Sequence, residues 1–372
     1  MSNEASKSVT LRYETKEGTE EAQFPANTPL LNLQRMRIAD IDLSQLSSFP
    51  NISTLDLQHN QLDFIDFSPL SSCQNLRTIL LNHNRALSTL NLSSLDRCHN
   101  LDTLQCDSTI LTEVDLSPLS NCRNLRVLRL GESNLTEIDL TPLSECTNLM
   151  ALSLRNNQLK DIDLSPLGRC TELRGIELDR NFISTIDLTP LDRCTNLEQF
   201  ELGHNQLQNI DLSPLGSCST LHRLYLPDNH LQSIDLEPLS SCTKLWELGL
   251  SGNQIHSFDL SPLEGQRELS FLSLGWNQVH NIDLGPLASC ARLRWLDLAY
   301  NQLQTIDLSP LSSCTSLQSL RLNDNQLQSI DLSPLSHCLN IKALYLRNDH
   351  LKHVDLSPLC VPNAERLLKD SH

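Results

Sequence analysis

LRWLDLAYNQLQTIDLSPLSSCTS, residues 293–316, is followed at once by LQSLRLNDNQLQSIDLSPLSHCLN, residues 317–340. The two stretches share the 24-residue pattern LxxLxLxxNxLxxIDLSPLxxCxx, which continues in phase in both directions. A fixed period of a few tens of residues indicates stacked structural units rather than one globular core. Fourteen units can be counted, beginning at residues 28, 52, 76, 101, 125, 149, 173, 197, 221, 245, 269, 293, 317 and 341. The first is degenerate, and the unit at 76–100 has 25 residues.

Each unit divides into an extended half and a return half. In LRWLDL the apolar residues alternate at a period of two, which predicts a strand with Leu296 and Leu298 inside and Trp295 and Asp297 outside. Successive units repeat this strand in one direction, so they predict a parallel sheet with strands about 4.8 Å apart. In the return segment IDLSPLxxC, Ser before Pro predicts a helix start with Ser as N-cap. The few residues before Cys allow only a short 3₁₀ or α turn.

The pattern resembles that of the leucine-rich-repeat family, and the resemblance covers residues 28–359. It implies an α/β solenoid, a horseshoe or arc, with a parallel β-sheet on the concave face and short 3₁₀ or α turns on the convex face. We expect an N-terminal capping hairpin or strand at 1–27, the repeat domain at 28–359, and a short C-terminal cap or tail at 360–372. The alternation of Val9, Leu11 and Tyr13 before the turn signal Glu17-Gly18 favours the hairpin.

Three polar positions recur so regularly that we assign them to the scaffold. Asn at the ninth position of ten units is expected to hydrogen-bond across turns. The Asp of IDL, present in thirteen units, is expected to accept backbone N–H bonds and accounts for much of the net charge of −17. Eleven of the 13 cysteines occupy one position, where parallel side chains would hold their Cβ atoms too far apart for disulfides. We expect these thiols to be small buried hydrophobes.

The terminal sequence and the thiols bear on location. The first residues, MSNEASKSV, have no signal-peptide shape, and no apolar run is long enough to span a membrane. Together with the absence of cysteine-rich caps, this predicts a cytoplasmic protein without membrane contact. Sequons at Asn51, Asn91 and Asn134 favour the alternative of an extracellular receptor or adhesin.

No catalytic motif is found, so we expect no enzyme activity, no cofactor and no metal. One carboxylate per turn supplies too few oxygens for Ca²⁺, and His59 and His83, neighbours on successive turns, are expected to be solvated. The acidic balance and the lack of a Lys/Arg cluster disfavour nucleic acid. A second alternative is that the chain is an interaction fragment of a larger enzyme, such as a kinase, GTPase or ubiquitin ligase.

Aromatic residues gather at the outward strand positions, which are the third, fifth, seventh and eighth of each unit. The chain is only 4% aromatic, yet all three Trp fall within 245–316, with Trp246 one residue off the pattern and Tyr345 on it. Aromatic residues and Arg dominate binding hot spots. The sequence therefore predicts a non-catalytic module that binds a protein partner on the concave face. The alternative is that the rings stack on one another for stability. The predicted contact residues are Tyr225, Phe271, Trp276, Trp295 and Tyr300, with Arg223, Glu247 and Asp297 as a polar rim.

Overall fold

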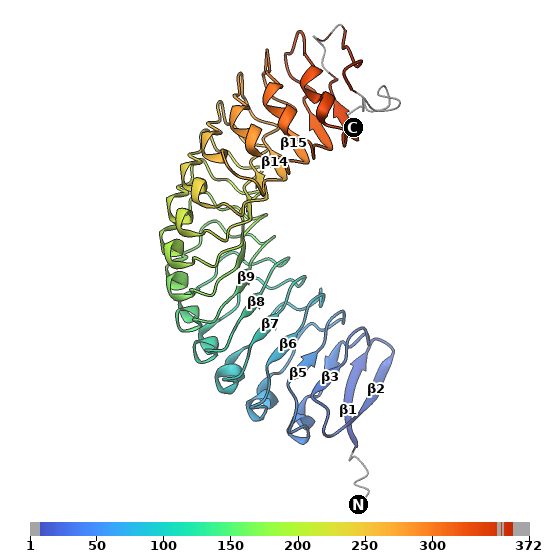
Figure 1. The fold of residues 1–372 in the computed structure, drawn as a ribbon. Helices are drawn as coiled ribbons and strands as arrows, with labels where there is room; N and C mark the ends of the chain where they lie inside the picture. Colours follow the sequence, from blue (N-terminus) through green and yellow to red (C-terminus); the bar gives the residue numbers. More distant parts are fainter. Residues whose placement is uncertain (1–7, 348–350, 352, 360–372) are drawn as a thin grey trace, which may run out of the picture. The chain divides into compact units, whose positions relative to one another are not determined.

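The computed structural model describes residues 8–347, 351 and 353–359. Its contacts divide the chain into two compact units, Met1–Phe182 and Ile183–His372. In both units a repeat contributes one short strand and one short 3₁₀ helix (Figure 1). The expected C-terminal cap at 360–372 lies outside the described residues.

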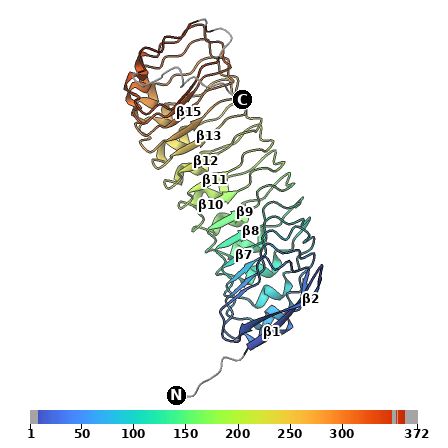
Figure 2. The same ribbon diagram turned by 90° about the vertical axis from the view of Figure 1, so that its right-hand side faces the viewer.

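The first unit begins with an antiparallel hairpin, β1–β2, whose first strand also pairs with β4. Val9, Leu11 and Tyr13 of this hairpin are buried. The parallel strands follow in the order β3-β5-β6-β7-β8-β9-β10, and Figure 2 shows β7 to β10 as successive steps. The elements are β1 Ser8–Thr15, β2 Gly18–Pro25, β3 Leu30–Asn32, β4 Asp40–Ile41, η1 Ser44–Ser48, β5 Thr54–Asp56, η2 Ser68–Ser72, β6 Thr78–Leu80, η3 Ser93–Arg97, β7 Thr103–Gln105, η4 Ser117–Asn121, β8 Val127–Arg129, η5 Thr141–Glu145, β9 Ala151–Ser153, η6 Ser165–Arg169 and β10 Gly175–Glu177.

In its described residues, the second unit repeats the same turn and contains no hairpin. Its parallel strands follow in the order β11-β12-β13-β14-β15-β16-β17. The elements are η7 Thr189–Arg193, β11 Gln199–Glu201, η8 Ser213–Ser217, β12 Arg223–Tyr225, η9 Glu237–Ser241, β13 Glu247–Gly249, η10 Ser261–Leu263, β14 Phe271–Ser273, η11 Gly285–Ser289, β15 Trp295–Asp297, η12 Ser309–Ser313, β16 Ser319–Arg321, η13 Ser333–His337 and β17 Ala343–Tyr345.

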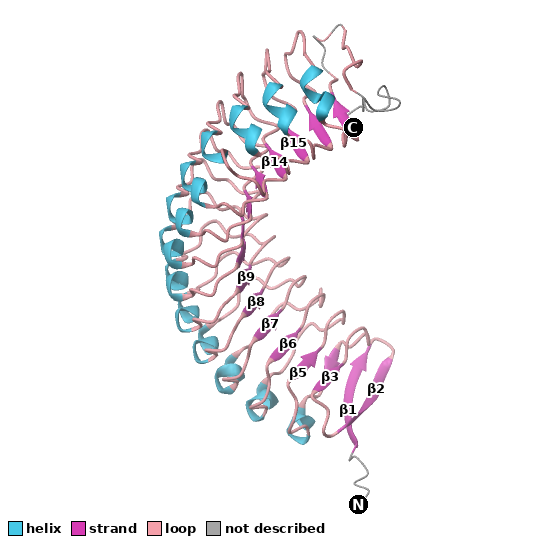
Figure 3. Cartoon of the chain, viewed as in Figure 1, coloured by secondary structure: helices cyan, strands magenta, loops and turns pink. Residues whose placement is uncertain are grey.

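Within each unit the strands line one side and the 3₁₀ helices the other (Figure 3). The core lies between them and consists mainly of leucine; Leu296, Leu298 and Leu311 of one turn are all fully buried. The predicted parallel sheet with short 3₁₀ turns is therefore confirmed. No helix in the described part of the chain has the length and hydropathy needed to cross a membrane.

The Ser-Pro signal does mark the 3₁₀ helices, but they begin one residue earlier than expected. The helix η12 starts at Ser309 itself, so Leu308 occupies the N-cap position and makes no side-chain cap. The expectation of Ser as N-cap is therefore wrong. The capping oxygen belongs to Asp307, whose Oδ1 accepts a hydrogen bond from the Ser309 backbone N–H at 2.8 Å. Asn91, which replaces Asp in one unit, accepts the equivalent bond from Ser93 at 2.9 Å.

The repeated asparagines connect successive turns, as the sequence predicts. Asn253 Nδ2 donates to the carbonyl oxygens of Leu226 and Leu250 at 3.1 Å each, and its Oδ1 accepts the Leu231 N–H at 3.1 Å. These contacts satisfy backbone groups that have left the sheet, which is why a buried amide recurs here.

The cysteines form a second line of contacts between turns. All twelve described cysteines are buried and free, which confirms their assignment to the core. The Cys146 thiol also donates weakly to the carbonyl oxygens of Leu119 and Cys122, at 3.5 and 3.6 Å. Gln266 stands at the same position in another turn and donates to the Leu239 carbonyl at 2.9 Å. Both Cys and Gln at this position therefore donate a hydrogen bond to a carbonyl oxygen of the preceding turn.

Candidate functional site

The eight sequence-predicted contact residues all lie in the second unit, on or just after its strands. We call the solvent-facing side of strands β12 to β17, together with the turn after each strand, the strand face. Arg223 and Tyr225 lie on β12, Glu247 on β13, Phe271 on β14, and Trp295 and Asp297 on β15, while Trp276 and Tyr300 follow β14 and β15 by three residues.

Strand register brings four of them into one row. Arg223 pairs with Glu247, Glu247 with Phe271, and Phe271 with Trp295 on successive parallel strands. Neighbouring strands lie about 4.8 Å apart, so adjacent members of this row are within side-chain contact. Two charged residues thus occupy one half of the row and two aromatic residues the other.

Tyr225 lies beside that row, over a glycine. Its strand partner is Gly249, where an added Cβ would lie only 2.6 Å from Tyr225 Cδ2. The missing side chain therefore makes the space that the ring occupies. Arg223 places its guanidinium carbon 5.2 Å from the centroid of the same ring. Burial, followed by the Glu247 charge, raises the pKa of Tyr225, so the phenol is neutral.

Arg223 also ties together two carboxylates of neighbouring strands. Its Nη1 lies 3.0 Å from Glu201 Oε1 and its Nε lies 3.1 Å from Glu247 Oε2. The three side chains are 30%, 17% and 19% exposed, so the cluster is half-buried. The Arg223 guanidinium is therefore held between two carboxylates in the free protein.

The remaining aromatic residues contact one another in pairs. Trp276 and Tyr300 stack with centroids 3.6 Å apart and planes inclined by 14°. Trp246 meets Phe271 edge to face at 5.5 Å. Trp276 keeps 57% of its surface exposed, whereas Phe271, Trp295 and Tyr300 are half-buried. Such pairs stabilise by about 0.5–1.5 kcal/mol beyond the area they bury.

The stack depends on a backbone feature that the repeat pattern did not reveal. Trp276 and Tyr300 have positive φ angles of 54° and 53°, in the left-handed region. The same position is left-handed in most other turns, and only at Gly252 is it a glycine. Non-glycine residues rarely adopt this conformation. The residue after each strand therefore turns sharply.

Asp297 is less available than the sequence suggests. It faces the strand side but is only 8% exposed, and its Oδ1 accepts the Ala299 N–H at 3.0 Å. Burial raises the pKa of Asp297, while the Ala299 bond and Arg321, whose Nη1 lies 3.7 Å away, oppose that rise. Asp297 thus faces Arg321 rather than solvent, and its predicted place in a polar rim stays a prediction.

Arg321 is the residue that the predicted set omitted. Its guanidinium carbon lies 4.7 Å from the Trp295 ring centroid and 4.8 Å from that of Tyr345. An arginine between two aromatic rings is a favourable cation–π arrangement. The signal was present in the sequence, because Arg321 and Tyr345 occupy the same repeat position as Asp297.

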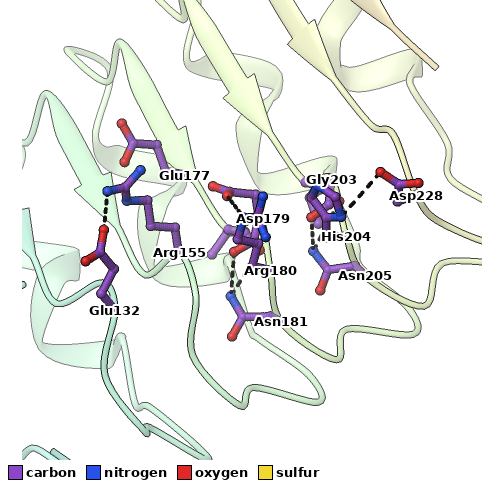
Figure 4. Close-up of polar contacts among 12 residues, drawn as sticks. Glu132, Arg155, Glu177, Asp179, Arg180, Asn181, Gly203, His204, Asn205 and Asp228 are labelled. Atoms are coloured by element: carbon purple, nitrogen blue, oxygen red, sulfur yellow. Dashed lines mark hydrogen bonds and ion pairs between the residues drawn. The ribbon is translucent and has the colours of Figure 1, made fainter. Parts of the chain in front are cut away.

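The parallel strands of the first unit, β3 and β5 to β10, carry charged side chains on the same side, but no Trp or Tyr. Arg155 pairs with Glu132 there (Figure 4), and Arg129 lies 3.8 Å from Glu177. In the second unit His204 Nδ1 lies 3.3 Å from Asp228 Oδ2, in the same view. The aromatic residues thus distinguish the strand face from the rest of the described repeats.

The two histidines expected to be neighbours are stacked. The rings of His59 and His83 lie 4.3 Å apart and are inclined by 22°. Burial and, next, the His83 charge lower the pKa of His59. Within residues 8–347, 351 and 353–359, no group of three or more His, Cys, Asp or Glu side chains could hold a metal ion.

Solved structures with the same fold bind different kinds of molecule. An internalin, inlF, of Listeria monocytogenes is 29% identical over 89% of this chain and 88% of its own, with a TM-score of 0.71. The plant peptide hormone receptor RGFR1, in complex with RGF2, is 19% identical over 93% of this chain and 64% of its own (TM-score 0.73). TLR13, in complex with ssRNA13, is 22% identical over 86% and 50% (TM-score 0.64). The fold is typical of interaction modules, which use such extended sheets as binding surfaces.

No curated protein matches the sequence. Family models do match it over most of its length. The model "BspA type Leucine rich repeat region (6 copies)" matches residues 27–126. The model "Leucine rich repeat" matches residues 123–181, 147–207, 195–255 and 219–279, and "Leucine Rich repeats (2 copies)" matches residues 291–337. The chain belongs to the leucine-rich-repeat family.

Proposed function

We propose that the strand face of the second unit binds a protein partner and that the chain is a non-catalytic interaction module. The observation that carries the proposal is Trp276, which is 57% exposed while its ring is held at 3.6 Å on Tyr300. A large apolar surface in contact with water destabilises the free protein. A partner that covers the ring would recover that free energy.

Other aromatic side chains of the strand face are also held by their neighbours. Trp295 is held by Arg321, and Tyr225 lies against Arg223. Side chains already fixed by their neighbours lose little conformational entropy when a partner binds. Trp, Tyr and Arg are also the residues on which interface free energy concentrates.

Stability alone is the competing explanation for the aromatic residues. The stack of Trp276 on Tyr300 would contribute to folding whether or not anything binds. It does not, however, require that Trp276 retain a mostly exposed ring or that Tyr225, Phe271 and Trp295 share one side of β12 to β15. The two explanations differ in what happens to folding and binding when the tryptophans are removed.

We infer that the partner is a protein rather than a nucleic acid. The net charge of −17 opposes binding to phosphates. Arg223 and Arg321 lie over aromatic rings of the strand face, and both already face carboxylates: Arg223 those of Glu201 and Glu247, and Arg321 that of Asp297. The RGFR1 complex with RGF2 supports this proposal and the TLR13 complex with ssRNA13 opposes it, so charge decides between them.

The proposal is tested by capture from a lysate of the source cells on the immobilised full chain. The double variant Trp276→Ala/Trp295→Ala should lose the captured protein while its melting temperature changes by only a few degrees. The matched control is Phe64→Ser/Phe182→Gln, which removes two exposed rings elsewhere, 50% and 46% exposed, in favour of residues that occur at those positions in other repeats. Equal capture by the tryptophan variant, or its failure to fold, refutes the proposal.

We also propose a reducing location for the protein. Its support is the set of twelve buried free thiols. Mass spectrometry of the protein isolated from its natural source tests this directly. A glycan on Asn134 would instead support the extracellular receptor or adhesin.

A further inference from the structure

A groove on the first unit combines apolar residues with carboxylates along its lining. It encloses a volume of about 930 Å³ along four successive turns, within residues 88–163. Its floor consists of Leu90, Val114, Ile138 and Ile162, one from each turn. Val114 and Ile138 are half-buried and reach the solvent, whereas Leu90 and Ile162 are buried.

Two rows of carboxylates border the floor. Asp115, Asp139 and Asp163 belong to the repeated IDL aspartates and form one row. Glu113, Glu137 and Asp161 form the second row, two residues earlier in each turn. All six are exposed, and no Lys, Arg or His lines the groove.

The second row does not belong to the repeat. From residue 173 onward the equivalent position is uncharged in seven successive turns. Those residues are Thr185, Asn209, Ser233, Ser257, Asn281, Thr305 and Ser329. Three consecutive turns thus carry an acidic residue where the seven turns that follow carry Thr, Asn or Ser, and these three turns are among the four along which the groove lies. The scaffold does not need them, because the later turns fold without them.

Only the first row has a role in the fold: Asp115, Asp139 and Asp163 each accept the backbone N–H of the residue two positions later, at 2.8 Å. The carboxylates of Glu113, Glu137 and Asp161 make no hydrogen bond within the described part of the chain, and no ion pair there involves any of the six carboxylates. No group of three could hold a metal ion among the described residues. Negative charge spread along an apolar floor instead matches a cationic side-chain pattern on an extended chain.

We propose that this groove binds an extended basic segment of another protein, in which Lys or Arg alternates with apolar residues. In an extended chain successive side chains point in opposite directions and the rise is about 3.3 Å per residue. Four turns at about 4.8 Å span roughly 14 Å, which accommodates four or five such residues. Apolar side chains rest on Val114 and Ile138, and the cationic side chains reach the carboxylate rows.

Fluorescence anisotropy of a labelled pentapeptide of alternating Lys and Leu, titrated with the full chain at low salt, tests the proposal. The groove variant is Glu113→Thr/Glu137→Asn/Asp161→Ser, which installs residues that other turns already carry there. The loss of three exposed ion pairs should weaken binding roughly tenfold. Raising the salt concentration should weaken binding to the wild-type chain.

The matched control removes three exposed carboxylates of the second unit, in Asp192→Ser/Glu237→Ser/Glu264→Ser. It should bind the peptide within twofold of the wild type. Equal weakening by both triple variants would reduce the effect to overall charge and overturn the proposal. A Lys/Ser peptide that binds as tightly as the Lys/Leu peptide would overturn it too, since the floor would then be unused. Calcium binding is measured by calorimetry on the same variants. If the groove variant loses calcium binding and the control retains it, the ligand of the groove is a metal ion and the peptide proposal is overturned.

Discussion

The ninth-position asparagines give the most direct test of how the turns are connected. Replacing Asn253 with Leu puts an apolar residue of similar size at a position that is 7% exposed. It removes the donor to Leu226 and Leu250 and the acceptor for the Leu231 N–H. The variant should therefore be less stable without any change in the strand face.

The expected decrease in the free energy of unfolding depends on which hydrogen-bond partners the backbone groups keep in the variant. The Leu226 carbonyl still accepts from Asn229 at 3.2 Å, and the Leu250 carbonyl from Asn277 at 3.0 Å. Each carbonyl thus loses one of two bonds, at about 0.5–1.5 kcal/mol apiece, whereas the Leu231 N–H loses the acceptor it has, at about 1–3 kcal/mol. The free energy of unfolding should fall by about 2–6 kcal/mol.

Urea unfolding followed by circular dichroism measures the fall, and hydrogen exchange locates it. The Leu231 amide should exchange faster than in the wild type because it has lost its acceptor. Gln254→Leu, one residue along and half-exposed, is the control and should stay within about 1 kcal/mol of the wild type. A decrease of less than 1 kcal/mol in Asn253→Leu, or unchanged protection at Leu231, would refute the bridging role.

Three further outcomes follow from the ionisable groups. Burial raises the pKa of Asp297, so its charged form is disfavoured in the folded state and the penalty is present above the folded pKa. Asp297→Asn should therefore raise the melting temperature at pH 7, and the gain should vanish as the pH falls to about 3; a lower melting temperature at pH 7 would contradict this. Hydrogen bonds from Ser213 and Ser309, two residues later in the chain, lower the pKa of Asp211 and Asp307. The folded state is therefore stabilised by these bonds above about pH 4, and this stabilisation is lost as the pH falls further. Asp211→Asn/Asp307→Asn should show a shallower loss of melting temperature below pH 4, and an unchanged acid limb would count against the capping role. Burial raises the pKa of Cys122 to about 12, so iodoacetamide at pH 8 should leave it and the other described thiols unmodified until the chain is unfolded, as read by peptide mass spectrometry.

The fold can be predicted well from the sequence because the same local pattern occurs in each of the fourteen repeats. Alternation in LxxLxL places Leu296 and Leu298 inside, and the structure buries both completely. The start of the 3₁₀ helices is the exception. Ser309 was expected to cap, but Asp307 does so from two residues earlier, because a carboxylate reaches the backbone N–H of Ser309 and leaves its side chain outside the turn.

The candidate site is less predictable, since outward position does not determine exposure. Trp276 and Asp297 were both placed on the outside, yet one is 57% exposed and the other 8%. The difference comes from neighbours on adjacent strands, such as Arg321 beside Asp297, and from the left-handed turn at Trp276. Neither a cross-strand neighbour nor a positive φ at a bulky residue can be read from a single repeat.

We expect the residues that bind partners to be those that depart from the repeat, and the solenoid allows each departure to be substituted by itself. Each turn contacts only its neighbours, so a substitution at an exposed, non-repeated position perturbs one local surface. The tryptophans of the strand face and the second carboxylate row of the groove lie in different units. Trp276→Ala/Trp295→Ala should therefore bind the Lys/Leu peptide as the wild type does, and the groove variant should capture the same lysate protein. Loss of both activities in either variant would mean that a single partner contacts both surfaces, which would join the two proposals into one extended interface.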